Sequence, residues 1–232
     1  MSAILLKQEI EYPTSDGQPM AETTLHRKVM ADLIEALERR YDGTPDVWVG
    51  GNLFLCYQKG DPAAAIAPDV LLAKGVAKLD RRNYLLWEET PPSLIVEVTS
   101  RKTRREDSGK KKDLYERIGV EEYVLFDPYG EWLRPQLQGF RLSEEGRYQP
   151  IPVAGGSLES RTTGLRLHPE AGRVRLVDFK TGEVLLWTDE LQAARDRAEA
   201  RAAAEAAGRQ ALEERVHALE EEVRRLRADL QR

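Results

Sequence analysis

Two apolar runs, each with an acidic residue at its edge, constrain the fold of this chain more than any other feature. Residues 69–73 read D-V-L-L-A and residues 94–99 read L-I-V-E-V-T, so Asp69 and Glu97 are the acids. Nearly continuous apolar runs of this length are typical of strands that are covered on both faces. An ionised carboxylate is costly there unless another group neutralises it. The alternative for Glu97 is an edge strand facing solvent, or a pair with an arginine.

A segment with helical spacing follows the second run and leads into a third. We expect a helix over residues 103–118, with its regular part beginning nearer Asp107 because Ser108 and Gly109 weaken the start. The run E-Y-V-L-F-D, which ends at Asp127, then forms a return strand. A strand, a helix and a second strand of one sheet form a right-handed crossover. The pattern predicts an α/β fold.

The remaining elements complete this expectation. A helix begins at Thr23 or Thr24, where a hydroxyl can cap the free amides, and it ends near Tyr41. Residues 47–57 read as two short strands around a Gly-Gly-Asn turn or bulge. Residues 78–89 read as a loop that packs its aromatic residues against the body. Residues 131–187 read as short strands that extend the sheet in antiparallel fashion.

The composition changes abruptly at the C-terminal end, where alanine, glutamate and arginine dominate. We therefore expect two domains, residues 1–188 and 189–232, with Gly208 as a weak point in the second. A heptad seam, with glutamates and arginines on its flanks, predicts a coiled coil and a homodimer. The alternatives are a helix folded back on the first domain and a helix paired with another protein. The seam residues are Leu212, Val216, Leu219, Val223, Leu226 and Leu230.

The net charge of −5 excludes a surface that is basic throughout, although it leaves room for a local basic patch. The single cysteine, Cys56, cannot form an internal disulfide, which favours a cytoplasmic protein. The N-terminal residues lack the basic start and long apolar region of a signal peptide. No apolar run approaches the roughly 20 residues that span a bilayer.

Asp69 and Glu97 on neighbouring apolar strands, followed by a polar helix, favour a metal site over two unrelated surface acids. Carboxylate oxygens are hard ligands that suit Mg²⁺ or Mn²⁺. A bound metal ion of this kind can activate water and polarise a phosphodiester. A nearby lysine would stabilise negative charge on the attacked phosphate.

Four motifs together resemble a known family. P-D-V at residues 68–70 is followed by E-V-T-S at 97–100, D-S-G-K-K-K-D-L-Y at 107–115 and G-V-E-E-Y-V-L-F-D-P at 119–128. This series is similar to the Uma-two family of proteins described as restriction endonucleases, within the PD-(D/E)XK nuclease superfamily. The resemblance covers roughly residues 10–185. It implies a restriction-endonuclease-like mixed sheet flanked by helices.

The resemblance also implies roles for individual residues. Asp69 and Glu97 would bind the metal, with the backbone carbonyl of Val98 nearby. The superfamily pattern places a lysine two residues after the glutamate, where this chain has Thr99. The family supplies the lysine from the following helix, and Lys111 is the corresponding residue here.

Three further residues are candidates for accessory roles. Asp107 lies four residues before Lys111, so one helical face presents both; its alternative role is a helix cap or a simple pair with Lys111. Glu22, before the first helix, resembles an acid that such nucleases place near a metal-bound water. His26 lies one turn later, and its alternative is a structural histidine. Packing accounts best for Tyr115 and Tyr123, and a turn accounts best for Asp127.

A local basic cluster just after Glu97 fits a phosphate backbone. The alternative is a solvated helix face balanced by Glu106, Asp107 and Asp113. The cluster consists of Arg101, Lys102, Arg104, Arg105, Lys110 and Lys112.

These observations favour a Mg²⁺- or Mn²⁺-dependent endonuclease that acts on double-stranded DNA. The alternative is a catalytically weak or inactive nuclease-fold protein that acts as an interaction module through its coiled coil. The absence of a lysine at position 99 and the acidic net charge motivate that alternative. A nuclease that acts on RNA or on nucleic-acid ends is a third hypothesis.

Overall fold

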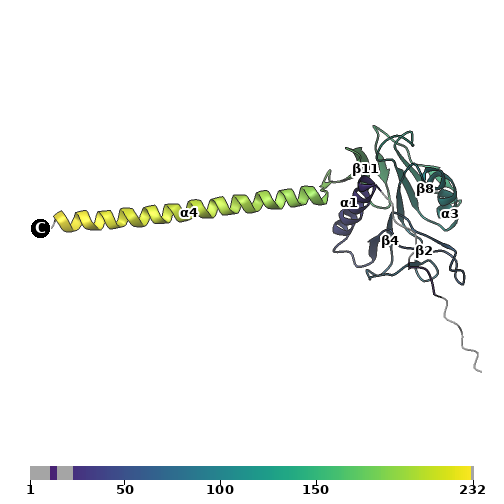
Figure 1. The fold of residues 1–232 in the computed structure, drawn as a ribbon, viewed down its shortest axis with the longest axis horizontal. Helices are drawn as coiled ribbons and strands as arrows, with labels where there is room; N and C mark the ends of the chain where they lie inside the picture. Colours follow the sequence, from purple (N-terminus) through teal and green to yellow (C-terminus); the bar gives the residue numbers. More distant parts are fainter. Residues whose placement is uncertain (1–10, 15–22, 231–232) are drawn as a thin grey trace, which may run out of the picture. The chain divides into compact units, whose positions relative to one another are not determined.

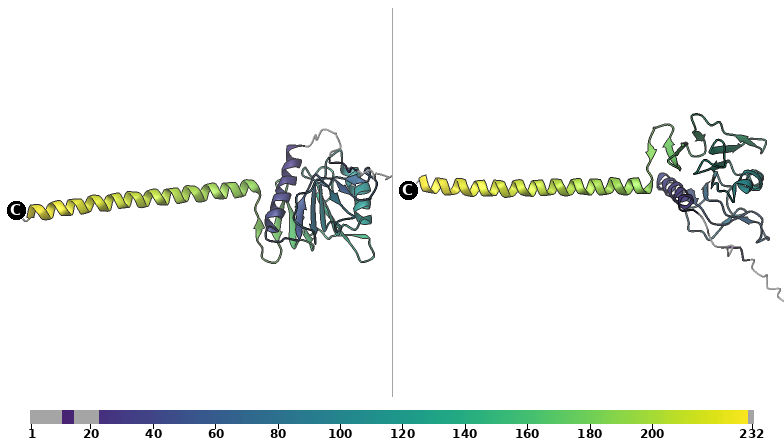
Figure 2. Two further views of the ribbon diagram at one scale, coloured as in Figure 1. Left: turned by 90° about the horizontal axis from the view of Figure 1, so that it is seen from below. Right: turned by 45° about the horizontal axis from the view of Figure 1, so that its top comes forward.

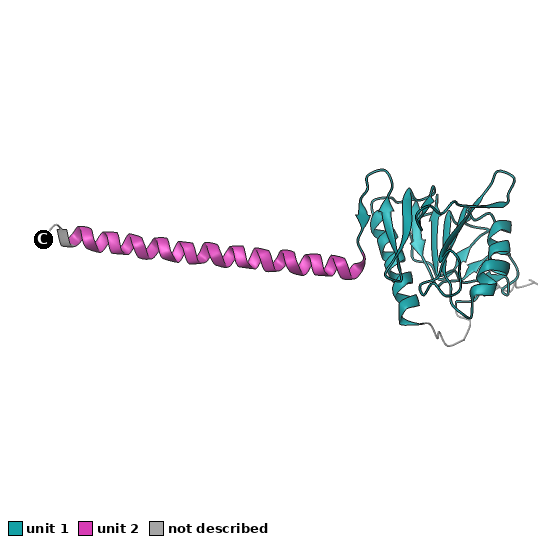
Figure 3. Ribbon diagram, turned by 90° about the horizontal axis from the view of Figure 1, so that it is seen from above, with its two compact units in different colours: residues 1–186 teal, residues 187–232 magenta. Residues whose placement is uncertain are grey.

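The computed structural model describes residues 11–14 and 23–230 of the chain. Glu22, one of the accessory residues expected from the sequence, lies outside the described residues. The chain divides into two compact units, residues 1–186 and residues 187–232, which Figure 3 colours separately. Each unit is described by itself below.

A six-stranded mixed sheet forms the centre of the first unit, with strand order β1-β4-β6-β7-β8-β9. β6 and β7 run parallel, and each of the other neighbouring pairs is antiparallel. The connection between β6 and β7 is helical, so the predicted crossover is confirmed. The strands are β1 (Val47–Gly50), β4 (Val70–Lys74), β6 (Leu94–Val98), β7 (Glu122–Phe126), β8 (Leu137–Leu142) and β9 (Tyr148–Pro150).

Helix α1 (Thr24–Arg40) covers one face of this sheet, and the crossover helix lies on the opposite face (Figures 1 and 2). The hydroxyl of Thr23 accepts a hydrogen bond from the backbone amide of His26 at 3.2 Å, so the predicted N-cap is confirmed. The buried side of α1 includes Val29, Leu33 and Leu37. The chain thus forms the predicted mixed α/β fold, with a sheet flanked by helices.

The crossover helix has three parts: α2 (Arg104–Glu106), a π turn η1 (Asp107–Lys111) and α3 (Lys112–Arg117). The prediction that the helix becomes regular only near Asp107 is wrong. The start is held by Ser100 and Thr103, whose side chains hydrogen-bond to each other and to each other's backbone amide. The irregularity lies instead in the π turn, which contains both Ser108 and Gly109.

Two smaller sheets adjoin the central one. β2 (Leu55–Cys56) pairs with β3 (Ala65–Ile66) and, in parallel, with β5 (Tyr84–Leu85). The two strands expected within residues 47–57 therefore exist but belong to different sheets, and the expected loop 78–89 contains a short strand.

The C-terminal part of the first unit was predicted only in part. β8 and β9 do extend the central sheet, but the strands that follow form a separate antiparallel sheet. Long-range packing against α1 selects this pairing, because Leu165, Leu167, Val174 and Leu176 share a core with the helix. The strands are β10 (Leu158–Ser160), β11 (Leu165–Glu170), β12 (Arg173–Asp178) and β13 (Val184–Leu185).

The central sheet separates two apolar cores. One contains α1, the four-stranded sheet and the side chains of alternate strand positions such as Val70 and Val96. The other contains Leu71, Ile95 and Tyr115, on the face that meets α3. Glu97 follows Ile95 by two positions and so belongs to the second face.

The second unit is a single helix, α4 (Thr188–Leu230). The helix continues through Gly208, so the expected weak point does not interrupt it. Its apolar seam residues from Leu212 to Leu226 are exposed, by between 46% and 66%. No helix among the described residues is both long enough and apolar enough to cross a membrane.

Candidate active site

The two acids of the apolar runs lie side by side at one end of the sheet. The antiparallel register of β4 and β6 pairs Val70 with Val96, so Asp69, just before β4, lies beside the end of β6 that carries Glu97. The Oδ2 atom of Asp69 accepts a hydrogen bond from the backbone amide of Val98 at 2.7 Å. The fold therefore brings Asp69 and Glu97 together, and the Val98 group that contacts Asp69 is the backbone amide rather than the carbonyl expected near the metal.

Glu97 is only 1% exposed, and both of its carboxylate oxygens have partners. Oε2 lies 2.9 Å from Nζ of Lys111, and Oε1 accepts a hydrogen bond from the hydroxyl of Tyr115 at 2.8 Å. The alternatives of a solvent-facing glutamate and an arginine pair are thus wrong. Burial raises the pKa of Glu97 to about 8; the Lys111 ammonium opposes this rise, and Asp69 adds to it.

Lys111 bridges two buried carboxylates. Its Nζ atom lies 2.9 Å from Oε2 of Glu97 and 3.3 Å from Oδ1 of Asp107. Burial alone would lower the pKa of Lys111, but these two carboxylates outweigh burial and raise it. The lysine is therefore a positive charge held between two acids.

Asp107 is also 1% exposed, and neither of its carboxylate oxygens receives a hydrogen bond from the described residues in the present geometry. Burial raises the pKa of Asp107, while Lys111 opposes the rise. Its contact with Lys111 agrees with the expected pair on one helical face. Such a poorly satisfied buried acid is a common feature of functional sites.

The π turn positions these groups. A π turn is wider than an α turn, and such insertions occur often at functional sites. The hydroxyl of Tyr123, on β7, donates a hydrogen bond to the backbone carbonyl of Asp107 at 2.9 Å. Tyr115 and Tyr123 were expected only to pack; both are buried, and both also hydrogen-bond to this constellation.

His26 approaches the acids from α1. Its Nε2 atom lies 3.4 Å from Oδ2 of Asp69, and its side chain is 10% exposed. The histidine thus faces the site, in agreement with the expectation for this position. Asp127 accepts hydrogen bonds from the backbone amides of Tyr129, Trp132 and Leu133, which confirms its role as a turn former.

The chemistry of the two strand-borne carboxylates fits Mg²⁺ or Mn²⁺. No group of three or more His, Cys, Asp or Glu side chains within the described residues is gathered for a metal. Mg²⁺ does not require one, since it is usually held by one or two carboxylates together with waters and phosphates. A carboxylate has about four lone-pair sites, so Glu97 retains acceptor capacity beyond Lys111 and Tyr115.

A cavity of about 480 Å³ opens beside the acids, where the parallel strands β6 and β7 end. His26 lies on its wall, which links the cavity to Asp69. The lining residues are Thr23, His26, Thr99, Ser100, Arg101, Lys102, Pro128, Tyr129, Glu131 and Trp132.

The predicted basic cluster is divided between different places. Arg101 and Lys102 line the cavity, and the guanidinium of Arg104 lies 4.8 Å from the ring centre of Trp132. Arg105 and Lys110 are exposed. Lys112 does not join them, because its ammonium lies over the ring of Phe140 at 4.1 Å.

Sequence reasoning missed the contribution of residues 129–132. The signal was available, because parallel strands end at the same edge of a sheet and residues after such ends meet there. Thr99 and Ser100 follow β6, while Pro128 to Trp132 follow β7. The Asp127 turn then directs the aromatic residues toward the cavity.

A mixed sheet thus carries two acids at one end, and the crossover helix supplies a lysine to one of them. The chain belongs to the Uma2 family, described as "Putative restriction endonuclease", which it matches over residues 3–170. No curated protein matches the sequence.

A solved structure described as "a putative nuclease belonging to DUF820", from Anabaena variabilis, is similar to this chain, with 14% sequence identity and a TM-score of 0.46. The similarity covers 66% of this chain and 82% of the other.

Proposed function

We propose that this protein is a metal-dependent endonuclease that hydrolyses phosphodiester bonds in DNA. The observation that carries the proposal is the position of Lys111, whose ammonium lies 2.9 Å from Glu97 although it comes from the π turn. Thr99 stands where the superfamily pattern has its lysine. Lys111 supplies the same positive charge from the helix, so the site still has two acids and a lysine.

Asp69 and Glu97 would hold the metal, with the Val98 carbonyl beside them. When bound, Mg²⁺ or Mn²⁺ would supply Lewis acidity toward the phosphodiester. The hydroxyl of Tyr115 orients the Glu97 carboxylate. Lys111 stabilises negative charge that develops on the phosphate, and Asp107 positions Lys111. His26 orients Asp69 from the other side.

The DNA backbone would approach over the cavity rim. Arg101 and Lys102 are exposed there, and they follow Glu97 closely in the sequence. Arg104, Arg105 and Lys110 add positive charge along the following helix. Lys112 has a smaller part in this surface, because its ammonium lies over Phe140.

The test is nicking of supercoiled plasmid in Mg²⁺ and in Mn²⁺, with wild type, Asp69→Ala and Glu97→Ala. We expect nicking that requires the metal and is lost in both variants. Calorimetry should show metal binding that disappears with the same substitutions. Metal-independent nicking, or nicking that survives in both variants, would refute the proposal.

The exposed seam of α4 favours a second candidate function. We propose that the protein self-associates through this helix, and a catalytically inactive member would then act as an interaction module. The seam residues from Leu212 to Leu226 are between 46% and 66% exposed. Absence of nicking on several substrates, combined with stable dimers in sedimentation, would favour this candidate over the nuclease.

A further inference from the structure

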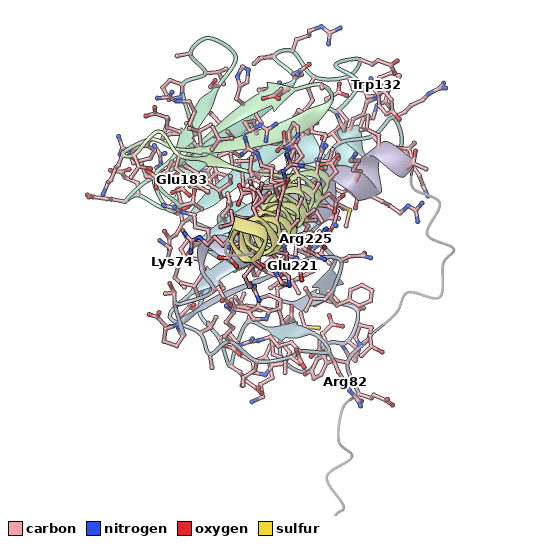
Figure 4. All side chains as sticks on the ribbon, turned by 90° about the vertical axis from the view of Figure 1, so that its left-hand side faces the viewer. Lys74, Arg82, Trp132, Glu183, Glu221 and Arg225 are labelled. Atoms are coloured by element: carbon pink, nitrogen blue, oxygen red, sulfur yellow. The ribbon has the colours of Figure 1, made fainter. Side chains whose placement is uncertain are left out.

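The cavity beside the acids has the lining of a nucleobase site. Its volume of about 480 Å³ falls within the range of roughly 300–1,000 Å³ for small-molecule sites. Tyr129 lines the cavity and is 53% exposed, so its ring is accessible to a ligand there. Trp132, labelled in Figure 4, presents a second aromatic ring. Aromatic rings beside a basic rim are the usual platform for stacked bases.

The polar groups of the lining favour a base over a phosphate. Glu131 places a carboxylate on the wall, which would repel a phosphate but can accept hydrogen bonds from the amino group of a base. Thr99 is 1% exposed, and its hydroxyl has no hydrogen-bond partner within the described part of the chain. Arg101 and Lys102 lie at the same cavity and suit the phosphates on either side of that base.

The tryptophan is held in place by its surroundings. The Arg104 guanidinium lies 4.8 Å from the ring centre, and the backbone amide of Trp132 donates to the carboxylate of Asp127. A fixed ring loses little conformational freedom when a base stacks on it.

We propose that this cavity binds one unpaired nucleobase of the strand whose phosphate lies at Asp69 and Glu97. The inference rests on the proposed nuclease function of the same site and narrows its substrate to nucleic acid with a base out of the helical stack. The base stacks on Trp132 and Tyr129, and its amino group faces Glu131.

The test compares binding of a short oligodeoxycytidylate with that of an abasic oligodeoxynucleotide of equal length. The protein is the full chain carrying Glu97→Gln, which prevents cleavage in Mg²⁺, and the readouts are affinity and tryptophan fluorescence. We expect tighter binding of the cytidylate and quenching by it. Adding Trp132→Leu should lower affinity for the cytidylate by about tenfold and leave the abasic affinity unchanged. Trp87→Leu is the matched control, since Trp87 contacts Tyr12 and does not line the cavity.

Equal affinity for the two oligonucleotides, or an unchanged affinity with Trp132→Leu, would overturn the base site and leave the nuclease proposal intact. Failure of plasmid nicking, together with a preference for the cytidylate that depends on Trp132, would support the base site and count against the nuclease proposal. The two proposals therefore fail separately.

The seam of α4 carries an independent inference about orientation. Its residues alternate between spacings of four and three, so Val216, Val223 and Leu230 occupy a positions of the heptad. Leu212, Leu219 and Leu226 occupy the d positions. Within parallel coiled coils, valine at a with leucine at d favours two strands over three or four.

The flanking charges favour the parallel orientation. In a parallel pair without stagger, a residue at g faces the residue five positions later on the second helix. Arg215 then faces Glu220 of the second copy, and Glu222 faces Arg227 of the second copy, so these contacts are attractive. An antiparallel pair centred on the seam would keep Glu213 opposite Arg227, but it would bring Glu220 against Glu220 and Glu222 against Glu222.

We infer that α4 pairs with a second copy of this chain in a parallel, unstaggered coiled coil. The first test uses disulfide formation in the full chain. The native Cys56 is buried, so an introduced cysteine is the only accessible thiol in the described residues. Val223→Cys should cross-link to itself in a parallel pair. In the centred antiparallel pair, Val223→Cys would cross-link only when mixed with Leu219→Cys.

The second test reverses charges and measures dimer affinity by sedimentation. Glu222→Arg should weaken the parallel dimer by about tenfold, and Glu222→Arg combined with Arg227→Glu should restore it. Glu221→Arg is the matched control: Glu221 and Arg225, both labelled in Figure 4, lie one turn apart outside the a, d, e and g positions. A monomer at all concentrations, no self-cross-link at position 223, or equal effects of Glu221→Arg and Glu222→Arg would overturn the inference.

Discussion

The hydroxyl of Tyr123 donates a hydrogen bond to the backbone carbonyl of Asp107, which ties the central sheet to the π turn. Tyr123→Phe removes this donor from a buried carbonyl, so the free energy of unfolding should fall by about 1 kcal/mol. Nicking should fall as well, because the turn carries both Asp107 and Lys111. Tyr148→Phe is the matched control: its hydroxyl bonds to the Val120 carbonyl at 3.0 Å, away from the acids. Denaturant unfolding and nicking assays would separate the two effects.

Glu97 and Glu122 are both buried, on neighbouring parallel strands, yet we expect them to respond differently to neutralisation. Burial raises the pKa of Glu97 to about 8, so its charge is costly to the fold. Glu97→Gln should therefore abolish metal binding while changing the free energy of unfolding by no more than about 1 kcal/mol. Glu122 pairs with Arg141 at 2.7 Å. Glu122→Gln should cost about 2 kcal/mol and leave metal binding unchanged. Equal stability losses would contradict this assignment.

Lys111 and Lys112 are adjacent but face different groups. Lys111→Gln removes the charge beside Glu97, and we expect at least about a hundredfold loss of nicking rate with the fold retained. Lys112→Gln removes only a cation over Phe140, so the rate should change little. Rates at saturating DNA would measure this difference. A larger loss from Lys112→Gln would assign the role in charge stabilisation to Lys112 rather than to Lys111.

Arg101 and Lys102 should contribute to DNA affinity through charge alone. Each substitution by alanine should reduce the dependence of log affinity on log salt by about one unit. Filter binding across a salt series measures the slope. Arg166→Ala is a suitable control, since Arg166 pairs with Glu159 on another part of the surface. An unchanged slope for Arg101→Ala and Lys102→Ala would remove these residues from the DNA surface.

Asp178 should make stability depend on acid pH. The backbone amides of Thr181 and Lys180, together with Arg40, lower its pKa from 3.8 to about 2. A lowered folded pKa means that the ionised group stabilises the fold above about pH 4, and this contribution disappears as pH falls toward about 2. The stability difference between wild type and Asp178→Asn should therefore shrink across that window. A difference that is constant with pH would contradict the prediction.

The sequence predicted those parts of the site that depend on local pattern. The Thr23 cap, the Asp69 and Glu97 edges and the crossover all follow from short stretches of residues. Lys111 came from a family resemblance, because nothing in a sequence of consecutive lysines says which one turns inward. The π turn decides that, and Ser108 and Gly109 indicated an irregular helix without indicating a π turn.

Long-range pairings were the part that the sequence did not predict. The four-stranded sheet depends on packing against α1, exemplified by the buried pair of Arg173 with Asp32 at 2.6 Å. These residues lie 141 positions apart in the chain. The hydroxyl bond of Tyr115 was missed for a similar reason, since helical spacing identifies a core-facing side chain but not the polar atom it meets.

The π turn also limits how the length of this chain can vary. Removing one residue between 107 and 111 would turn the preceding segment by about 100° relative to α3. Asp107 would then leave the side of the helix that holds Lys111. The turn at Gly146, where a left-handed conformation joins β8 to β9, faces no such constraint. Insertions and deletions among descendants of this sequence should therefore accumulate in the hairpin and be eliminated from residues 107–111.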